Sequence, residues 1–270
     1  TALASSLVVT SAVAGEMSVT GGASIGLKNT TKTASGKSWT MGNQLTFSGS
    51  GELDNGMNVS LSFVIDQGDQ TTETTARSPF DSHSVTVSSD TLGTLVFSGE
   101  GGSSAQTAID TTAAGDLWNN GSGITGPIAS EAGNNSMMYT LPSIMDDLTL
   151  KASYSPGSAG GGSATAWAAS FSGVEGLSLD VGIGQTETVG SKAEHTTYKA
   201  SYAIGSFTVG YSNTENDGSD ITNEELTSYN LAYTVSDDIS ITYGSETLDT
   251  TGSSVDEEME GFGISYTTGG

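Results

Sequence analysis

The sequence predicts an all-β protein, a transmembrane antiparallel β-barrel of about sixteen strands in the intact protein, about fourteen of them in this chain. Three observations predict it: strands with alternating polarity, connectors that alternate between short and long, and an unusual composition. Apolar residues are 34% and charged residues 14% of the 270 residues, against roughly half and a quarter in soluble domains. A barrel with a polar lumen has this composition because only one face of each strand must be apolar.

Alternation of polarity is clear in the first strand-length segment, residues 16–28. Met17, Val19, Ala23, Ile25 and Leu27 share one parity, and polar residues dominate the other. Successive side chains of a strand point to opposite faces, so one face is apolar and one is polar. The pattern recurs at residues 44–53, 57–66, 85–87, 95–97, 137–141, 148–154, 167–171, 177–183, 198–204, 207–211, 229–235, 239–243 and 262–266.

The connectors between these segments alternate in length. Short turns, rich in Asn, Asp and Gly, are predicted at 54–56, 89–91, 145–147, 173–176, 205–206 and 236–238. Long connectors are predicted near 29–38, 67–80, 101–135, 156–163, 187–194, 213–224 and 247–257. Short turns on the periplasmic side and long loops on the outer side are typical of outer-membrane barrels.

The two ends of the chain predict processing and an incomplete barrel. Residues 1–15 resemble the end of a secretory signal, with Ala12-Val13-Ala14 as a small-x-small cleavage site; the alternative is an ordinary N-terminal strand. Residues 16–270 are then the barrel. Thr267-Thr268-Gly269-Gly270 reads as the start of another turn, so we expect a final hairpin to be missing. The alternative is that fourteen strands close by themselves.

Net charge limits the partners that this chain can have. The formal charge is −24, which argues against nucleic acid and favours cations as partners. The chain has no cysteine, so no disulfide can hold the fold. The acidic groups in the predicted outer loops could bind Ca²⁺, although the preferred interpretation is a solvated anionic surface; no cofactor is expected. These groups are Asp66, Asp69, Glu73 and Asp81; Glu215, Asp217, Asp220, Glu224 and Glu225; and Asp249, Asp256, Glu257, Glu258 and Glu260.

The sequence contains no set of residues spaced as in a known catalytic or metal site. His83 and His195 have no partner at metal-ligand spacing, and nothing marks a nucleophile. We therefore expect that the protein is not an enzyme.

Three segments carry a resemblance to a known family: Phe80–Val87, Leu92–Glu100 and Asn135–Ser143. A Leu-Gly-Thr-Leu strand, a long insertion and an Asn-Ser-x-x-Tyr-Thr-x-Pro strand follow one another here. In order and spacing the chain resembles the trimeric general porins of Gram-negative outer membranes, in particular the α-proteobacterial type. The resemblance covers essentially all of residues 16–270.

That resemblance assigns the pore constriction to the loop of residues 100–135, which folds into the lumen in the family. Its carboxylates are Glu100, Asp110, Asp116 and Glu131, and it holds no Lys or Arg. Ala105 to Ala114 could form a short helix. The alternative is a flexible outer loop with solvated carboxylates.

The pore wall departs from the family pattern, in which an arginine cluster faces the acidic loop. The only arginine is Arg77, in a long connector. The wall charges at lumen parity are instead Lys28, Lys151, Lys199, Glu52, Asp66 and Asp180. This sequence predicts a polar, acidic pore that favours cations.

The leading functional hypothesis is an outer-membrane porin that passes ions and small hydrophilic solutes by passive diffusion. Its surroundings would be the lipid bilayer and lipopolysaccharide, and the resemblance implies a homotrimer. One alternative is an acidic structural or adhesive surface β-protein without an open pore. The other is an outer-membrane enzyme, which the missing catalytic cluster disfavours.

Overall fold

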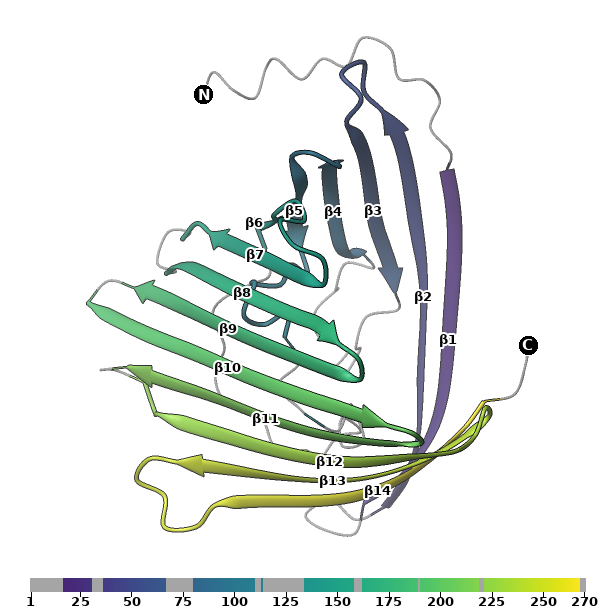
Figure 1. Ribbon diagram of the computed structural model, residues 1–270, viewed down its shortest axis with the longest axis vertical. Coiled ribbons are helices and arrows are strands. Elements are labelled where there is room, and N and C mark those ends of the chain that lie inside the picture. Colours follow the sequence, from purple (N-terminus) through teal and green to yellow (C-terminus); the bar gives the residue numbers. More distant parts are fainter. Residues whose placement is uncertain are drawn as a thin grey trace.

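A single antiparallel sheet makes up the computed structural model, which describes residues 17–30, 36–66, 80–109, 113, 134–157, 162–188, 190–218 and 221–267. Its strands are β1 (Met17–Thr30), β2 (Gly36–Glu52), β3 (Asn58–Asp66), β4 (Phe80–Ser89), β5 (Gly93–Glu100), β6 (Ser136–Thr140), β7 (Leu148–Ser155), β8 (Ser163–Val174), β9 (Leu177–Thr188), β10 (Ser191–Ile204), β11 (Phe207–Gly218), β12 (Glu224–Ser236), β13 (Ile239–Thr250) and β14 (Glu257–Tyr266). Each strand pairs with the next in chain order, and the 14-stranded sheet curls around one concave side (Figure 1). The prediction of an all-β antiparallel fold with about fourteen strands in this chain is confirmed.

The convex face of the sheet is apolar. Met17, Ile25 and Trp39 are 75%, 75% and 72% exposed, and the register places such residues side by side, as in the pair Tyr211 and Tyr229. Neighbouring aromatic rings stack there, with centroids 4.7 Å apart for Phe47 and Phe63. A continuous apolar surface of this kind requires an apolar surrounding. No helix in the described part of the chain is long and apolar enough to cross a membrane.

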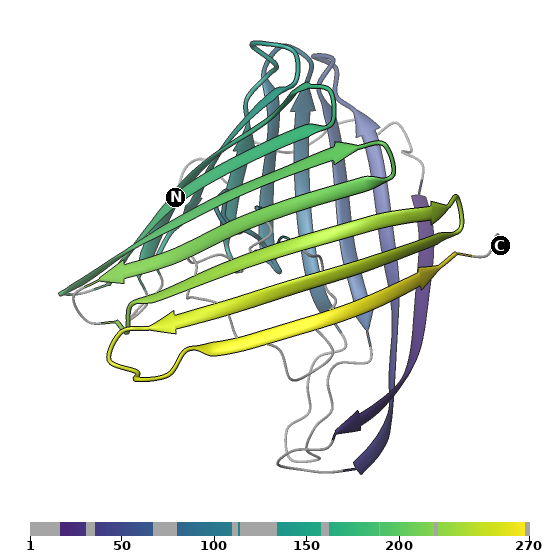
Figure 2. The same ribbon diagram turned by 60° about the horizontal axis from the view of Figure 1, so that its bottom comes forward.

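Tight turns join the strands at one end of the sheet (Figure 2). Gly176 between β8 and β9 has φ 77°, a conformation that glycine adopts without steric cost. A Cβ at that position would also collide with the carbonyl oxygen of Ala203. The predicted short turns are therefore placed correctly, because Gly and Asp supply the positive φ that these turns need.

Three connectors predicted to be long are partly strand. The segments 187–194, 213–224 and 247–257 were predicted as loops, but β9, β10, β11, β12, β13 and β14 extend into them. Here the convex-face residues are acidic rather than apolar, for example Glu194, Glu215 and Asp249. The apolar alternation stops while the hydrogen-bond ladder continues, so the sequence pattern underestimates the strand length.

Candidate pore and its inward loop

The concave face carries mainly polar and small residues, for example Ala166 and Ala168 on β8. Direct register partners on successive strands form rows across this face. One such row contains Gly182, Thr197, Thr214, Leu226 and Leu248. The buried polar strand residues of this face are Ser136, Ser155, His195, Thr197, Ser212, Thr214, Asn216, Ser228 and Glu246. Buried polar groups usually have hydrogen-bond partners, and part of the connector between β5 and β6 supplies partners for Thr197 and Ser228.

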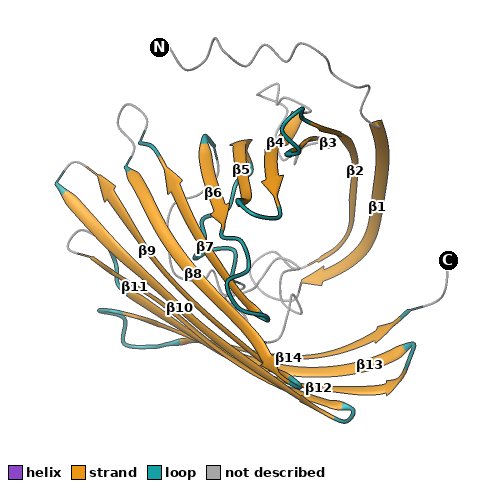
Figure 3. Cartoon of the chain, turned by 45° about the horizontal axis from the view of Figure 1, so that its top comes forward, coloured by secondary structure: helices purple, strands orange, loops and turns teal. Residues whose placement is uncertain are grey.

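Residues 101–109 and 113 of that connector lie on the concave side of the sheet (Figure 3). The backbone N–H of Ala105 donates to Ser153 Oγ on β7 at 2.8 Å. Gln106 Nε2 donates to Thr197 Oγ1 on β10 at 2.7 Å, and Thr197 Oγ1 lies 3.1 Å from Thr214 Oγ1 on β11. The N–H of Ala113 donates to Ser228 Oγ on β12 at 3.0 Å. Wall hydroxyls on three strands thus hold the connector.

Apolar packing supports the same arrangement. Ala105 and Ile109 form a buried cluster with Ala166 and Ala168 of β8. On β9, a Cβ at Gly182 would lie 2.9 Å from Ile109 Cδ1 and 3.0 Å from Gln106 Cα. Small wall residues therefore let the connector approach the sheet closely.

Locally the connector is a hydrogen-bonded turn. Ser104 N–H donates to Thr107 Oγ1 at 2.8 Å, and Thr107 N–H donates to Ser104 Oγ at 3.0 Å. The N–H of Ala108 donates to Ser104 O at 2.9 Å. The short helix expected from the sequence over residues 105–114 is not present in the described residues 105–109, which form a hydrogen-bonded turn.

Most predicted wall charges lie on the concave face by register. Lys199 on β10 is directly opposite Asp180 on β9, and Ser178 Oγ donates to Asp180 Oδ2 at 3.4 Å. Lys151 is opposite Thr140 and Ala168. Glu52 and Asp66 are opposite Asn58 and Gln44. Lys28 is opposite Ser38, and its side chain lies outside the described residues.

The predicted constriction residues are only partly described. Glu100 ends β5 opposite His83, where the register shifts. Asp110, Asp116 and Glu131 lie outside the described residues.

Other carboxylates on the concave face were missed in the sequence. They are Glu224, Glu246 and Glu257. Each lies on the concave face because its register partner, Asn216, Ser228 or Leu248 respectively, lies there. Parity could have found them, because the apolar residues of β13, such as Tyr243, have the opposite parity to Glu246. On this face carboxylates outnumber lysines: Glu52, Asp66, Asp180, Glu224, Glu246 and Glu257 against Lys28, Lys151 and Lys199.

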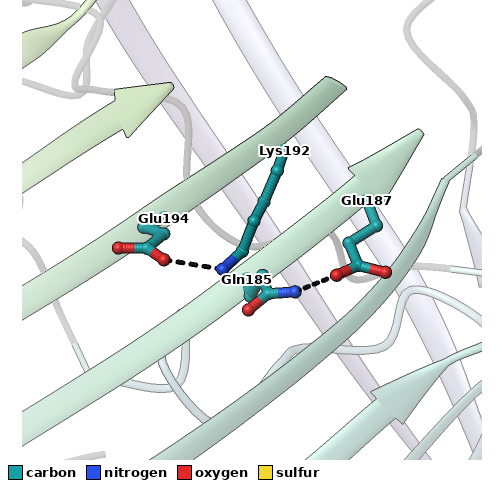
Figure 4. A network of polar contacts seen from close by, with 4 residues as sticks. All are labelled: Gln185, Glu187, Lys192 and Glu194. Atoms are coloured by element: carbon teal, nitrogen blue, oxygen red, sulfur yellow. Dashed lines mark hydrogen bonds and ion pairs between the residues drawn. The ribbon is translucent and has the colours of Figure 1, made fainter. Parts of the chain in front are cut away.

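Acidic side chains also gather on the convex face near the long connectors. Glu225 on β12 is directly opposite Glu215 on one side and Asp249 on the other. On the neighbouring strands, Lys192 Nζ lies 2.8 Å from Glu194 Oε1, and Gln185 donates to Glu187 (Figure 4). Within the described ranges, no group of three or more His, Asp or Glu side chains is arranged to hold a metal ion.

A model of the family described as Gram-negative porin matches residues 1–270. The chain belongs to the Gram-negative porin family. A comparison with curated proteins finds no match to this sequence.

Solved porin structures share the fold. Salmonella typhi OmpF, in complex with daunomycin, is 9% identical with a TM-score of 0.72, covering 95% of this chain and 87% of that one. A loop L8 deletion mutant of OmpT, an outer membrane protein of Vibrio cholerae, is 16% identical with a TM-score of 0.70, covering 95% and 90%. The anion-selective porin from Comamonas acidovorans is 16% identical with a TM-score of 0.66, covering 92% and 84%.

Family membership identifies the concave face as the wall of a diffusion pore and the convex face as the membrane-facing surface. This porin is an outer-membrane channel for passive diffusion rather than an enzyme. The connector between β5 and β6, together with Glu100 at its start (residues 100–135), is named here the inward loop because its described residues 101–109 and 113 lie on the concave side of the sheet.

Proposed function

We propose that this porin favours cations over anions. The observation that carries the proposal is the excess of carboxylates over lysines on the lumen face. A narrow, low-dielectric passage lined by one sign of charge concentrates the opposite ions. The net charge of −24 acts in the same direction.

The inward loop is proposed to form the constriction, with Glu100, Asp110, Asp116 and Glu131 as its acidic groups. The anchors of Ala105, Gln106 and Ala113 support this assignment, because they hold the start of the loop against the lumen wall. A pore is most selective where it is narrowest, so carboxylates at that level count most.

The wall charges are proposed to shape the field along the pore. Lys199 and Asp180 are direct register partners, so their opposite charges largely cancel for a passing ion. The remaining predicted wall charges are Lys28 and Lys151, which are positive, and Glu52 and Asp66, which are negative. Lysines are flexible point charges and form a weaker field than stacked arginines, so the carboxylates prevail.

Charge-neutralising variants test this proposal in planar bilayers with a KCl gradient. We expect Asp110→Asn with Asp116→Asn to move the reversal potential towards zero. The matched control is Glu215→Gln with Glu225→Gln, which removes two charges from the convex face and should leave the reversal potential nearly unchanged. An equal effect of both pairs would show that only the overall charge matters. Unchanged selectivity in the loop variant would remove the loop from the constriction.

A homotrimer is also proposed. Gly21 and Ala23 provide small residues on the convex face of β1, and the Cβ of a residue at position 21 would approach Leu45 Cδ2 to 3.0 Å. Small residues allow close approach of two membrane-embedded surfaces. Light scattering of the detergent-solubilised protein, corrected for bound detergent, should give three chains; a monomeric mass would contradict this.

A further inference from the structure

One row of serines crosses the first six strands on the lumen face. Ser18 pairs with Ser48, Ser48 with Ser62, Ser62 with Ser84, Ser84 with Ser98, and Ser98 with Ser136. Each serine is the direct register partner of the next, so consecutive Cβ atoms are about 5 Å apart. The hydroxyls therefore form one unbroken line, here named the serine row.

The adjacent row on the same face is not continuous. It contains Ser50, Ser60 and Thr86, and is then interrupted by Val96 and Met138. The serine row also carries no charge, unlike the row of Glu52 and Asn58. An uninterrupted line of neutral hydroxyls is therefore a distinct feature of this wall.

Five of these six hydroxyls are available to solutes, whereas Ser136 is buried and already makes an interaction. Ser18 is exposed, and Ser48, Ser62, Ser84 and Ser98 are half-buried. Among the described residues, these last four make no side-chain hydrogen bond to one another or to other side chains. The described anchors of the inward loop lie elsewhere, on β7, β10 and β12.

The row runs from the start of β1 to the strands that flank the inward loop. Ser18 lies at the start of β1, on the side of the short periplasmic turns. Ser98 and Ser136 lie where the inward loop leaves and rejoins the sheet, next to the hydrogen bond from Asn135 N–H to Gly99 O at 3.2 Å. Strands of such barrels tilt by about 35–45°, so a line perpendicular to the strands also rises along the pore axis.

We propose that the serine row is a hydrogen-bonding track for uncharged, polyhydroxylated solutes such as sugars and polyols. The proposal rests on the pore function and adds a solute class to it. A solute hydroxyl entering a narrow passage loses water partners, and a serine hydroxyl can both donate and accept in their place. Equivalent hydroxyls at regular spacing let the solute exchange partners stepwise without a deep binding minimum.

Swelling of liposomes that contain the full-length protein tests the track. The two solutes are arabinose and triethylene glycol, which are of similar size but differ in hydroxyl number. The variant is Ser48→Ala, Ser62→Ala, Ser84→Ala and Ser98→Ala. We expect the arabinose rate, divided by the triethylene glycol rate, to fall about three- to tenfold, the size of a lost net hydrogen bond.

The matched control removes four hydroxyls at lumen parity outside the serine row with Thr20→Val, Thr40→Val, Thr208→Val and Thr242→Val, and should leave the ratio within about twofold of wild type. A second variant with Ser→Thr at the four row positions retains the hydroxyls and should preserve the ratio. KCl conductance of each variant confirms an assembled pore. An unchanged ratio in a conducting Ser→Ala variant, or an equal fall in the control, would overturn the track. Absence of conductance in the wild type would instead contradict the pore function.

Discussion

Gln106 Nε2 donates a 2.7 Å hydrogen bond to Thr197 Oγ1, which joins two residues 91 positions apart. Both side chains are fully buried. The Thr197 hydroxyl also lies 3.1 Å from Thr214 Oγ1, so one wall hydroxyl connects the inward loop to two strands. It is one of three wall hydroxyls that hold the loop, with Ser153 and Ser228.

Replacing Thr197 by Val should loosen the inward loop. The substitution retains the side-chain shape but leaves the buried Gln106 amide without its acceptor, at a cost of about 1–3 kcal/mol. We expect larger fluctuations of the open-channel current and a lower unfolding temperature. Thr208→Val is the control, because Thr208 is on the same face, opposite Ala203 and Ala232, and outside the described loop contacts. Open-channel noise equal to that of wild type would show that this bond does not fix the loop.

Close approach of the loop to the wall predicts a strong effect of Gly182→Ala. The new Cβ would lie 2.9 Å from Ile109 Cδ1 and 3.0 Å from Gln106 Cα, both too short for carbon atoms, so the loop must shift. We expect a changed single-channel conductance and a destabilisation of about 1–3 kcal/mol from overpacking. Gly22→Ala is the matched lumen-face control, because its Cβ would meet nothing within 4 Å. Equal conductance in the two variants would contradict this packing.

Strand segments and their two faces could be predicted from the sequence because apolar and polar residues alternate with period two. The loop anchors could not. Ser153, Thr197 and Ser228 look like any other lumen hydroxyl, and the path of residues 104–113 determines which of them bind. The ends of β10 to β13 were also missed, since their convex residues become acidic although the ladder continues.

Repulsion on the convex face predicts that Glu225→Gln stabilises the protein at low salt. Glu225 lies between Glu215 and Asp249 in the register, and like charges directly opposite are unfavourable. Gln retains an oxygen that can accept the 2.6 Å hydrogen bond from Asn213 Nδ2. We expect a gain of about 0.2–1 kcal/mol in urea unfolding, which disappears at high salt because exposed charges are screened.

Glu258→Gln is the control for this pair, because the register partner of Glu258 on β13 is the neutral Thr247. It should change stability little at either salt concentration. A salt-independent gain in Glu225→Gln would indicate a cause other than charge repulsion.

Opposite faces of one strand should respond differently to charge. Leu231 on the convex face of β12 is 46% exposed, and Ala232, the next residue, faces the lumen opposite Thr208. Leu231→Lys should cost about 2–4 kcal/mol of folding stability in lipid if it lies near the bilayer centre, whereas Ala232→Lys should cost much less. Urea titration of folding into lipid vesicles measures both. A larger cost for Ala232→Lys would mean that the two faces are assigned in reverse.

The central claim, an acidic lumen that passes cations preferentially, is tested most directly by the sign of the reversal potential of the wild-type protein in a KCl gradient. The predicted result is stepwise channel openings whose reversal potential has the sign of the potassium equilibrium potential. A reversal potential with the sign of the chloride equilibrium potential would contradict the account, because the lumen carboxylates would then not control which ions permeate.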